Sequence, residues 1–102
     1  MHGAYKTPGG KLVAVDFEVA DGRLHGVAVH GDFFLYPEEA LADITGALEG
    51  LPADLAEAEI AGRVRAAIPP GTEWLGASPE ALGVAVRRAL SPAEAETSAS
   101  HD

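Results

Sequence analysis

The amino-acid sequence predicts an α+β domain in which a small antiparallel sheet packs against three helices. Two runs of alternating apolar and polar residues meet at an Asp-Gly pair, which is the pattern of a β-hairpin. Three later segments carry apolar residues at helical spacing. Because 102 residues form one modest core and the last twelve are small and polar, we expect one domain over residues 1–90 and a disordered tail over 91–102.

The hairpin is the strongest local signal in the chain. Its first run, residues 11–20, places apolar side chains at alternate positions: Val13, Val15, Phe17 and Val19. Asp21 and Gly22 then form the turn, because a type I′ turn needs positive φ at both central residues and these two residue types tolerate it. The second run, residues 23–30, pairs with the first, and we expect it to end at Gly31, before two adjacent phenylalanines.

Residues 1–10 are expected to be an extended arm and loop, because they contain a Pro-Gly-Gly triplet and no periodicity. Lys6 and Lys11 flank the triplet. A flexible Gly-Gly segment between two ammonium groups could approach an anion on a ligand or a partner. An ordinary loop with two solvated lysines is the commoner outcome, and the residues alone favour it, because the longer pattern of a phosphate-binding nucleotide loop is absent.

Three helices are expected, over residues 37–49, 55–67 and 78–90. A proline followed by two glutamates suits the start of the first helix. The triplet Ser78-Pro79-Glu80 offers the third helix an N-cap, a first-turn proline and an acidic first turn. Between the last two helices, residues 72–77 form either a short third strand or a loop that tucks Trp74 into the core, and we favour the strand.

Composition excludes several classes of function. Without cysteine the chain has no thiol nucleophile, persulfide carrier, disulfide or thiolate metal site. A net charge of −9, with only 7 lysines and arginines, argues against nucleic-acid binding, which needs a basic surface. The acidic residues suit a basic partner or, more commonly, keep a small protein soluble. Because no long apolar run or signal peptide is present, we expect a cytoplasmic protein without membrane contact.

His25, His30 and Asp32 are a weak candidate for acid/base chemistry or metal binding. The two histidines are an odd number of positions apart, so on a regular strand they point to opposite faces and cannot share a metal ion, although a bulge in the strand could change that. The sequence also contains no hydrolase elbow, paired helical histidines or dinucleotide-binding motif. We therefore expect neither a metal site nor a catalytic site here.

Phe33, Phe34 and Tyr36 form the densest aromatic cluster in the chain. They either plug the core between the hairpin and the first helix or belong to a contact surface. For the two phenylalanines we expect one ring inward and one outward. An apolar surface exposed beside Asp32 would mark a partner site.

Two segments, taken together, carry a family resemblance. They are Tyr5-Lys6-Thr7-Pro8-Gly9-Gly10-Lys11-Leu12-Val13 and Gly31-Asp32-Phe33-Phe34-Leu35-Tyr36-Pro37-Glu38-Glu39. With the helix that begins at Ser78, they resemble the C-terminal accessory domain of lipoate-protein ligases, over nearly the whole chain from His2 to about Leu90. The resemblance implies partner-contacting or active-site-closing roles for eight residues: Lys6, Gly9, Gly10, Lys11, Gly31, Asp32, Phe33 and Phe34.

The resemblance implies a function that depends on another chain. In that family the accessory domain is fused behind a catalytic domain or made as a separate small subunit, and it is associated with formation of the lipoyl-adenylate intermediate. This sequence lacks the catalytic domain, so the resemblance implies a non-catalytic accessory subunit of a split ligase. It would bind no cofactor alone, meet lipoate, ATP and Mg²⁺ through the catalytic subunit, and meet lipoyl-domain acceptor proteins indirectly.

The family fold is similar to that of the sulfur-acceptor and iron-sulfur scaffold proteins, the SufE/IscU-like fold. Those relatives act through cysteine, so the absence of cysteine here excludes their chemistry. Two other hypotheses stay open. The chain could be a free-standing binding or regulatory module that keeps the fold without the ligase partnership, or, ranked last, a small acid/base enzyme that uses the two histidines and the aspartate considered above.

Overall fold

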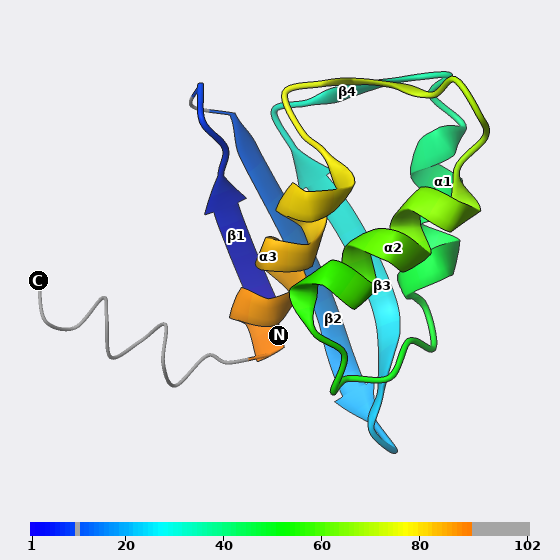
Figure 1. Cartoon of the computed structure of the whole chain (residues 1–102). Helices are drawn as coiled ribbons and strands as arrows, with labels where there is room; N and C mark the ends of the chain where they lie inside the picture. Colours follow the sequence, from blue (N-terminus) through cyan, green and yellow to red (C-terminus); the bar gives the residue numbers. More distant parts are fainter. Residues whose placement is uncertain (10, 91–102) are drawn as a thin grey trace, which may run out of the picture.

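Helices cover one face of a three-stranded antiparallel sheet, and a separate two-stranded ribbon lies beyond one end of that sheet (Figure 1). The computed structural model describes residues 1–9 and 11–90, so Gly10 and the tail predicted for 91–102 lie outside the described residues. The elements in chain order are β1 (His2–Lys6), β2 (Leu12–Ala20), β3 (Arg23–Gly31), β4 (Phe34–Tyr36), α1 (Ala40–Leu48), α2 (Glu57–Ala67), β5 (Glu73–Leu75) and α3 (Pro79–Leu90). This arrangement confirms the predicted α+β class.

The predicted hairpin is confirmed as β2 and β3. Their antiparallel register runs from Ala20 opposite Arg23 to Val13 opposite Gly31, with one irregularity between Asp16 and Glu18. At the turn, Asp21 has a φ of 54° and Gly22 a φ of 72°, the positive values that the Asp-Gly pair was expected to supply. The strand also ends at Gly31, as predicted.

The prediction of an extended arm over residues 1–10 is wrong for its first half. His2–Lys6 forms β1, an edge strand that pairs antiparallel with β2 from His2 opposite Asp16 to Lys6 opposite Leu12. The physical reason is close packing with α3. A Cβ atom on Gly3 would lie 2.2 Å from the carbonyl oxygen of Ala85, so only glycine lets the strand approach the helix this closely.

The short strand predicted over residues 72–77 exists, but it does not join the hairpin. It is β5, and it pairs with β4 to form the two-stranded ribbon. Both earlier alternatives for Trp74 hold at once, because the residue lies in a strand and its ring, partly buried, packs against the core.

The three helices form close to where the sequence predicts them, but α1 begins at Ala40 and α2 at Glu57. The prediction that Pro37 opens the first helix is wrong, because Pro37 precedes α1 and Glu39 is its N-cap residue. Ser78 caps α3, since its Oγ accepts a hydrogen bond from the Ala81 amide at 3.1 Å. The largest fully buried side chains come from the hairpin and all three helices: Val13, Val15, Leu24, Ile44, Leu48, Ile60, Val64, Leu82 and Val86. No helix among the described residues is long and apolar enough to cross a membrane.

Candidate functional site

The sheet topology brings the two motif segments together. Residues 7–9 and 11 lie between β1 and β2, and β3 ends beside the start of β2. The Asp32 amide donates a hydrogen bond to the Leu12 carbonyl oxygen at 2.9 Å, which ties the two segments at one end of the sheet. We call this end, with Lys6, Gly9, Lys11 and residues 31–34, the motif corner. The segment after β5 also reaches this end, because the Thr7 hydroxyl lies 3.3 Å from the Gly76 carbonyl oxygen and can donate to it.

Two glycines permit this close approach. A Cβ atom on Gly31 would lie 2.1 Å from the Leu12 carbonyl oxygen, and Gly31 has a φ of 149°. A Cβ atom on Gly76 would lie 2.9 Å from Cγ of Lys11 and 3.2 Å from the Asp32 carbonyl oxygen. Gly31 therefore has a packing role, and Gly76, which sequence analysis missed, belongs to the same corner.

The two phenylalanines point in different directions, as expected. Phe33 is partly buried and packs against the core, whereas Phe34 is 67% exposed. In the ribbon, Phe34 lies opposite Leu75, and Tyr36 lies opposite Glu73. Because directly opposed residues of two strands share a face, Phe34, Tyr36 and Leu75 lie together on the side away from the core. We call these three side chains the outer ribbon face; each is more than half exposed.

The charged motif residues surround this corner. Lys6, Lys11 and Asp32 are all exposed. Within residues 1–9 and 11–90, no hydrogen bond or ion pair engages their side chains. Gly9 has a φ of 104° in the turn between the lysines, and a Cβ atom there would meet nothing within 4 Å. The corner thus presents two ammonium groups and one carboxylate next to exposed aromatic rings.

An open pocket of about 340 Å³ adjoins the Thr7–Gly76 contact. The β1–β2 turn forms one wall, and the start of α3 forms the other. Among the described residues that line it, only Glu80 is charged, and its carboxylate is paired with Arg65. The hydrogen bond from Arg65 holds the pKa of Glu80 below its usual value, so this carboxylate has a structural partner and is not poised for proton transfer.

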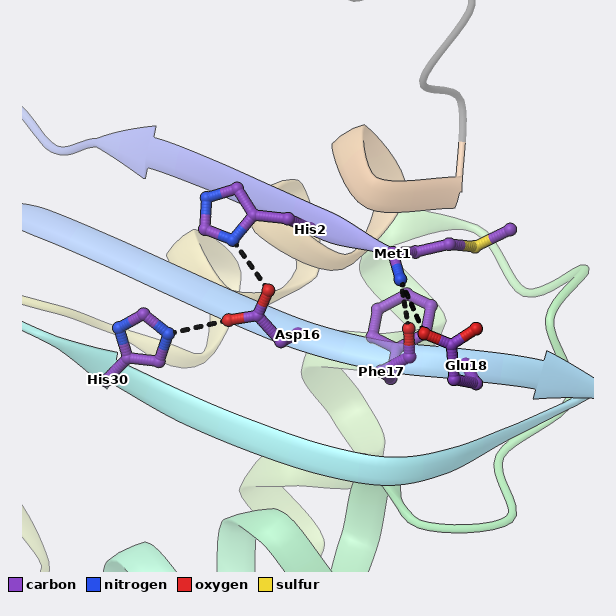
Figure 2. A network of polar contacts seen from close by, with 6 residues as sticks. All are labelled: Met1, His2, Asp16, Phe17, Glu18 and His30. Carbon is purple, nitrogen blue, oxygen red and sulfur yellow. Dashed lines mark hydrogen bonds and ion pairs between the residues drawn. The ribbon is translucent and has the colours of Figure 1, made fainter.

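The three residues of the weak acid/base candidate, His25, His30 and Asp32, do not come together in the structure. His30 hydrogen-bonds through Nε2 to Asp16, not Asp32, at 2.8 Å, and His2 of β1 reaches the other carboxylate oxygen through Nδ1 at 2.8 Å (Figure 2). These bonds, the one with His30 first, hold the pKa of Asp16 below its usual value.

The expectation that His25 and His30 point to opposite faces is wrong, because the register shift between Asp16 and Glu18 places His25 opposite Glu18, on the same face of β3 as His30. His25 is nevertheless apart from the other two side chains, with its Nδ1 3.8 Å from Glu49. Among the described residues no group of three or more histidine, aspartate or glutamate side chains is arranged so that it could hold a metal ion.

Glu49, like Asp16, is a carboxylate whose hydrogen bonds the sequence analysis did not predict. Its two carboxylate oxygens accept hydrogen bonds from the amides of Gly26 and Val27, each at 3.0 Å. These bonds, with Val27 the larger cause, lower the pKa of Glu49. Since it satisfies backbone amides on the open edge of β3, its role is structural.

Comparison with known proteins identifies the fold. No protein-family model matches this chain, and no curated protein matches its sequence. A solved structure is similar: a chain from an archaeal lipoylation system, comprising a bipartite lipoate protein ligase and its E2 lipoyl domain, from Thermoplasma acidophilum. The two are 24% identical, the match covers 85% of this chain and 98% of that one, and the TM-score is 0.65. The two chains share a fold.

Proposed function

We propose that this chain is the non-catalytic accessory subunit of a two-part lipoate-protein ligase and supports lipoyl-adenylate formation by a separate catalytic subunit. The observation that carries the proposal is the fold match to a chain of the Thermoplasma system, which covers 98% of that chain. With 85% of this chain in the match, the two are of similar length. This supports a correspondence with one small component of that lipoylation system, and the two motif segments favour the accessory subunit of the ligase.

The composition of the motif corner also supports a contact role. An exposed aromatic ring can anchor a protein interface, and charged groups around it contribute to specificity and to the rate of association. The sequence contains no cysteine and no phosphate-binding nucleotide motif. We therefore assign lipoate, ATP and Mg²⁺ to the catalytic subunit in the cytoplasm, and contact with lipoyl-domain acceptors to the assembled ligase.

Reconstitution tests the proposal. The catalytic subunit from the source organism is incubated with lipoate, ATP and Mg²⁺, with and without this chain, and lipoyl-adenylate is quantified by mass spectrometry. We expect adenylate to accumulate only when both chains are present. Equal amounts with and without this chain would overturn the proposal and favour a free-standing module.

Calorimetry tests the assignment of ATP to the partner. A titration of this chain alone with ATP and Mg²⁺ should give no binding heat, because the sequence offers no phosphate-cradling loop. A dissociation constant in the micromolar range would move Lys6 and Lys11 from contact residues to nucleotide ligands.

The charged motif residues can be tested separately from the fold. We expect Lys11→Glu to weaken the complex by roughly 1–3 kcal/mol, with smaller losses for Lys6→Ala and Asp32→Ala, because these groups are exposed at the proposed contact. Arg63→Glu is the matched control, since it makes the same charge change on the exposed side of α2. If Lys11→Glu and Arg63→Glu behave alike, only net charge matters and the corner is not the contact.

A further inference from the structure

The outer ribbon face is unusual for a surface that only solvent covers. Phe34 is 67% exposed, and Tyr36 and Leu75 are each 53% exposed. The other exposed large apolar side chains of the described residues, Met1, Leu12 and Leu41, range from 37% to 44%. Exposed apolar side chains gathered on one small surface are typical of binding sites, whereas single ones need no explanation.

The inner face of the ribbon anchors it to the rest of the molecule. Each of its strands is only three residues long, and an isolated two-stranded ribbon is at best marginally stable in water. It is anchored from its inner face, where Leu35 is 5% exposed and the Trp74 ring packs against the core. Because the inner pair supplies the burial, the apolar character of the outer face needs another explanation.

The two ends of the outer ribbon face carry different charged residues. At the end where Phe34 opposes Leu75, the chain continues into Gly76, beside which the Lys11 side chain lies. At the other end, Glu73 opposes Tyr36. The face is therefore an apolar strip with Lys11, and Asp32 close to it, at one end and Glu73 at the other. A complementary surface would place an acidic residue near Lys11 and a basic residue near Glu73, around an apolar recess.

We propose that the outer ribbon face inserts into an apolar recess on the catalytic subunit, with a basic residue of that subunit facing Glu73 and an acidic one facing Lys11. This inference rests on the proposed function. Charge also decides between a partner and a second copy of the chain. A net charge of −9 makes two copies repel each other, whereas it favours a partner with a basic surface.

Binding measurements on matched variants test the inference. The dissociation constant for the catalytic subunit of the source organism is measured by calorimetry for the wild type, Phe34→Ala, Leu75→Ala and Glu73→Lys. Glu73→Lys should raise the constant, because the new lysine would face the proposed basic residue of the partner. We expect the two truncations each to raise it by roughly 10- to 100-fold, as for anchor residues at the centre of an interface. His25→Ala is the control, because it removes an exposed ring elsewhere on the hairpin and should leave the constant unchanged within about twofold.

A second measurement needs no variant. On adding the unlabelled catalytic subunit to ¹⁵N-labelled wild-type chain, the amide signals of residues 34–36 and 73–76 should shift or broaden most. Largest changes on α1 and α2 instead would overturn the inference even if a truncated variant failed to fold.

The outcomes separate the inference from the proposed function. If the wild type binds the catalytic subunit and supports adenylate formation, but Phe34→Ala and Leu75→Ala bind equally well, the inference alone falls. If the wild type does not bind at all, both fall. Sedimentation that shows a wild-type dimer abolished by Phe34→Ala would assign the face to a second copy and would also overturn the inference.

Discussion

The two sheets of this molecule direct their large side chains in opposite ways. On β2, Val13, Val15 and Phe17 face the helices and are at most 2% exposed, while the outer face carries small or polar residues such as Ala14 and Asp16 after Leu12 at its start. On the ribbon, bulky side chains lie on both faces, with those of Phe34, Tyr36 and Leu75 turned to solvent. The difference agrees with our proposal that the ribbon also serves as a contact surface, whereas the larger sheet serves folding.

The largest expected loss of stability comes from the core beneath the larger sheet. Leu82 of α3 is fully buried, so Leu82→Ala should lower the free energy of unfolding by about 2–5 kcal/mol through lost burial and a residual cavity. Urea denaturation measures this. Leu41→Ala is the matched control, because that leucine is 37% exposed and should cost clearly less. Equal losses for the two variants would contradict the described packing.

Two neighbouring residues of β4 allow the inner and outer faces of the ribbon to be compared within one strand. Leu35→Ala should cost about 2 kcal/mol, because its side chain is 5% exposed. Phe34→Ala should stay within about 0.5 kcal/mol of the wild type, because its ring is largely in solvent. Thermal and urea unfolding of both variants check this. A larger loss for Phe34→Ala would make that ring a core residue and remove the argument for the ribbon as a contact surface.

A smaller effect is expected at the start of α3, which lines the pocket beside the motif corner. Ser78→Ala should lower the free energy of unfolding by about 1 kcal/mol, because it removes the oxygen that accepts the Ala81 amide hydrogen bond. Ser78→Asp restores an acceptor and should recover most of the loss. If the aspartate variant is as unstable as the alanine variant, the cap is not the cause.

The smallest expected effect is the pH response of the exposed Asp16 cluster. The pKa of Asp16 is lower in the folded chain than its ordinary value of 3.8, chiefly because of the hydrogen bond with His30. Its contribution to stability is therefore present above pH 3.8 and is lost as the pH falls through the lower folded value. The melting temperatures of the wild type and Asp16→Asn should differ above pH 3.8 and converge below the folded pKa of Asp16. A difference in melting temperature that persists at the lowest pH would contradict this explanation.

The fold could be predicted where its signals are local. The turn at Asp21 and Gly22 and the cap at Ser78 depend on residues within a few positions, and both are confirmed. Strand β1 could not be predicted, because its stability comes from the contact of Gly3 with α3, more than eighty residues away. The pairing of β4 with β5 is non-local in the same way, since 36 residues separate Tyr36 from Glu73 in the sequence.

The candidate site was predictable to a similar extent. Antiparallel pairing alone places the turn before β2 and the corner after β3 at one end of the sheet, where the structure has them. Gly76 and Leu75 were missed because only the non-local ribbon brings them to that corner. The bond between His2 and Asp16 was missed for the same reason as β1 itself.

Lipoate-dependent exchange of labelled pyrophosphate into ATP tests the central claim most directly, because it reports reversible lipoyl-adenylate formation without any acceptor protein. A fixed amount of the source organism's catalytic subunit is titrated with this chain, and Phe34→Ala and His25→Ala are titrated in parallel. The account predicts negligible exchange without this chain, a saturable rise with the wild type and His25→Ala, and a rise displaced to higher concentration with Phe34→Ala. Full exchange by the catalytic subunit alone, unaffected by this chain, would contradict it.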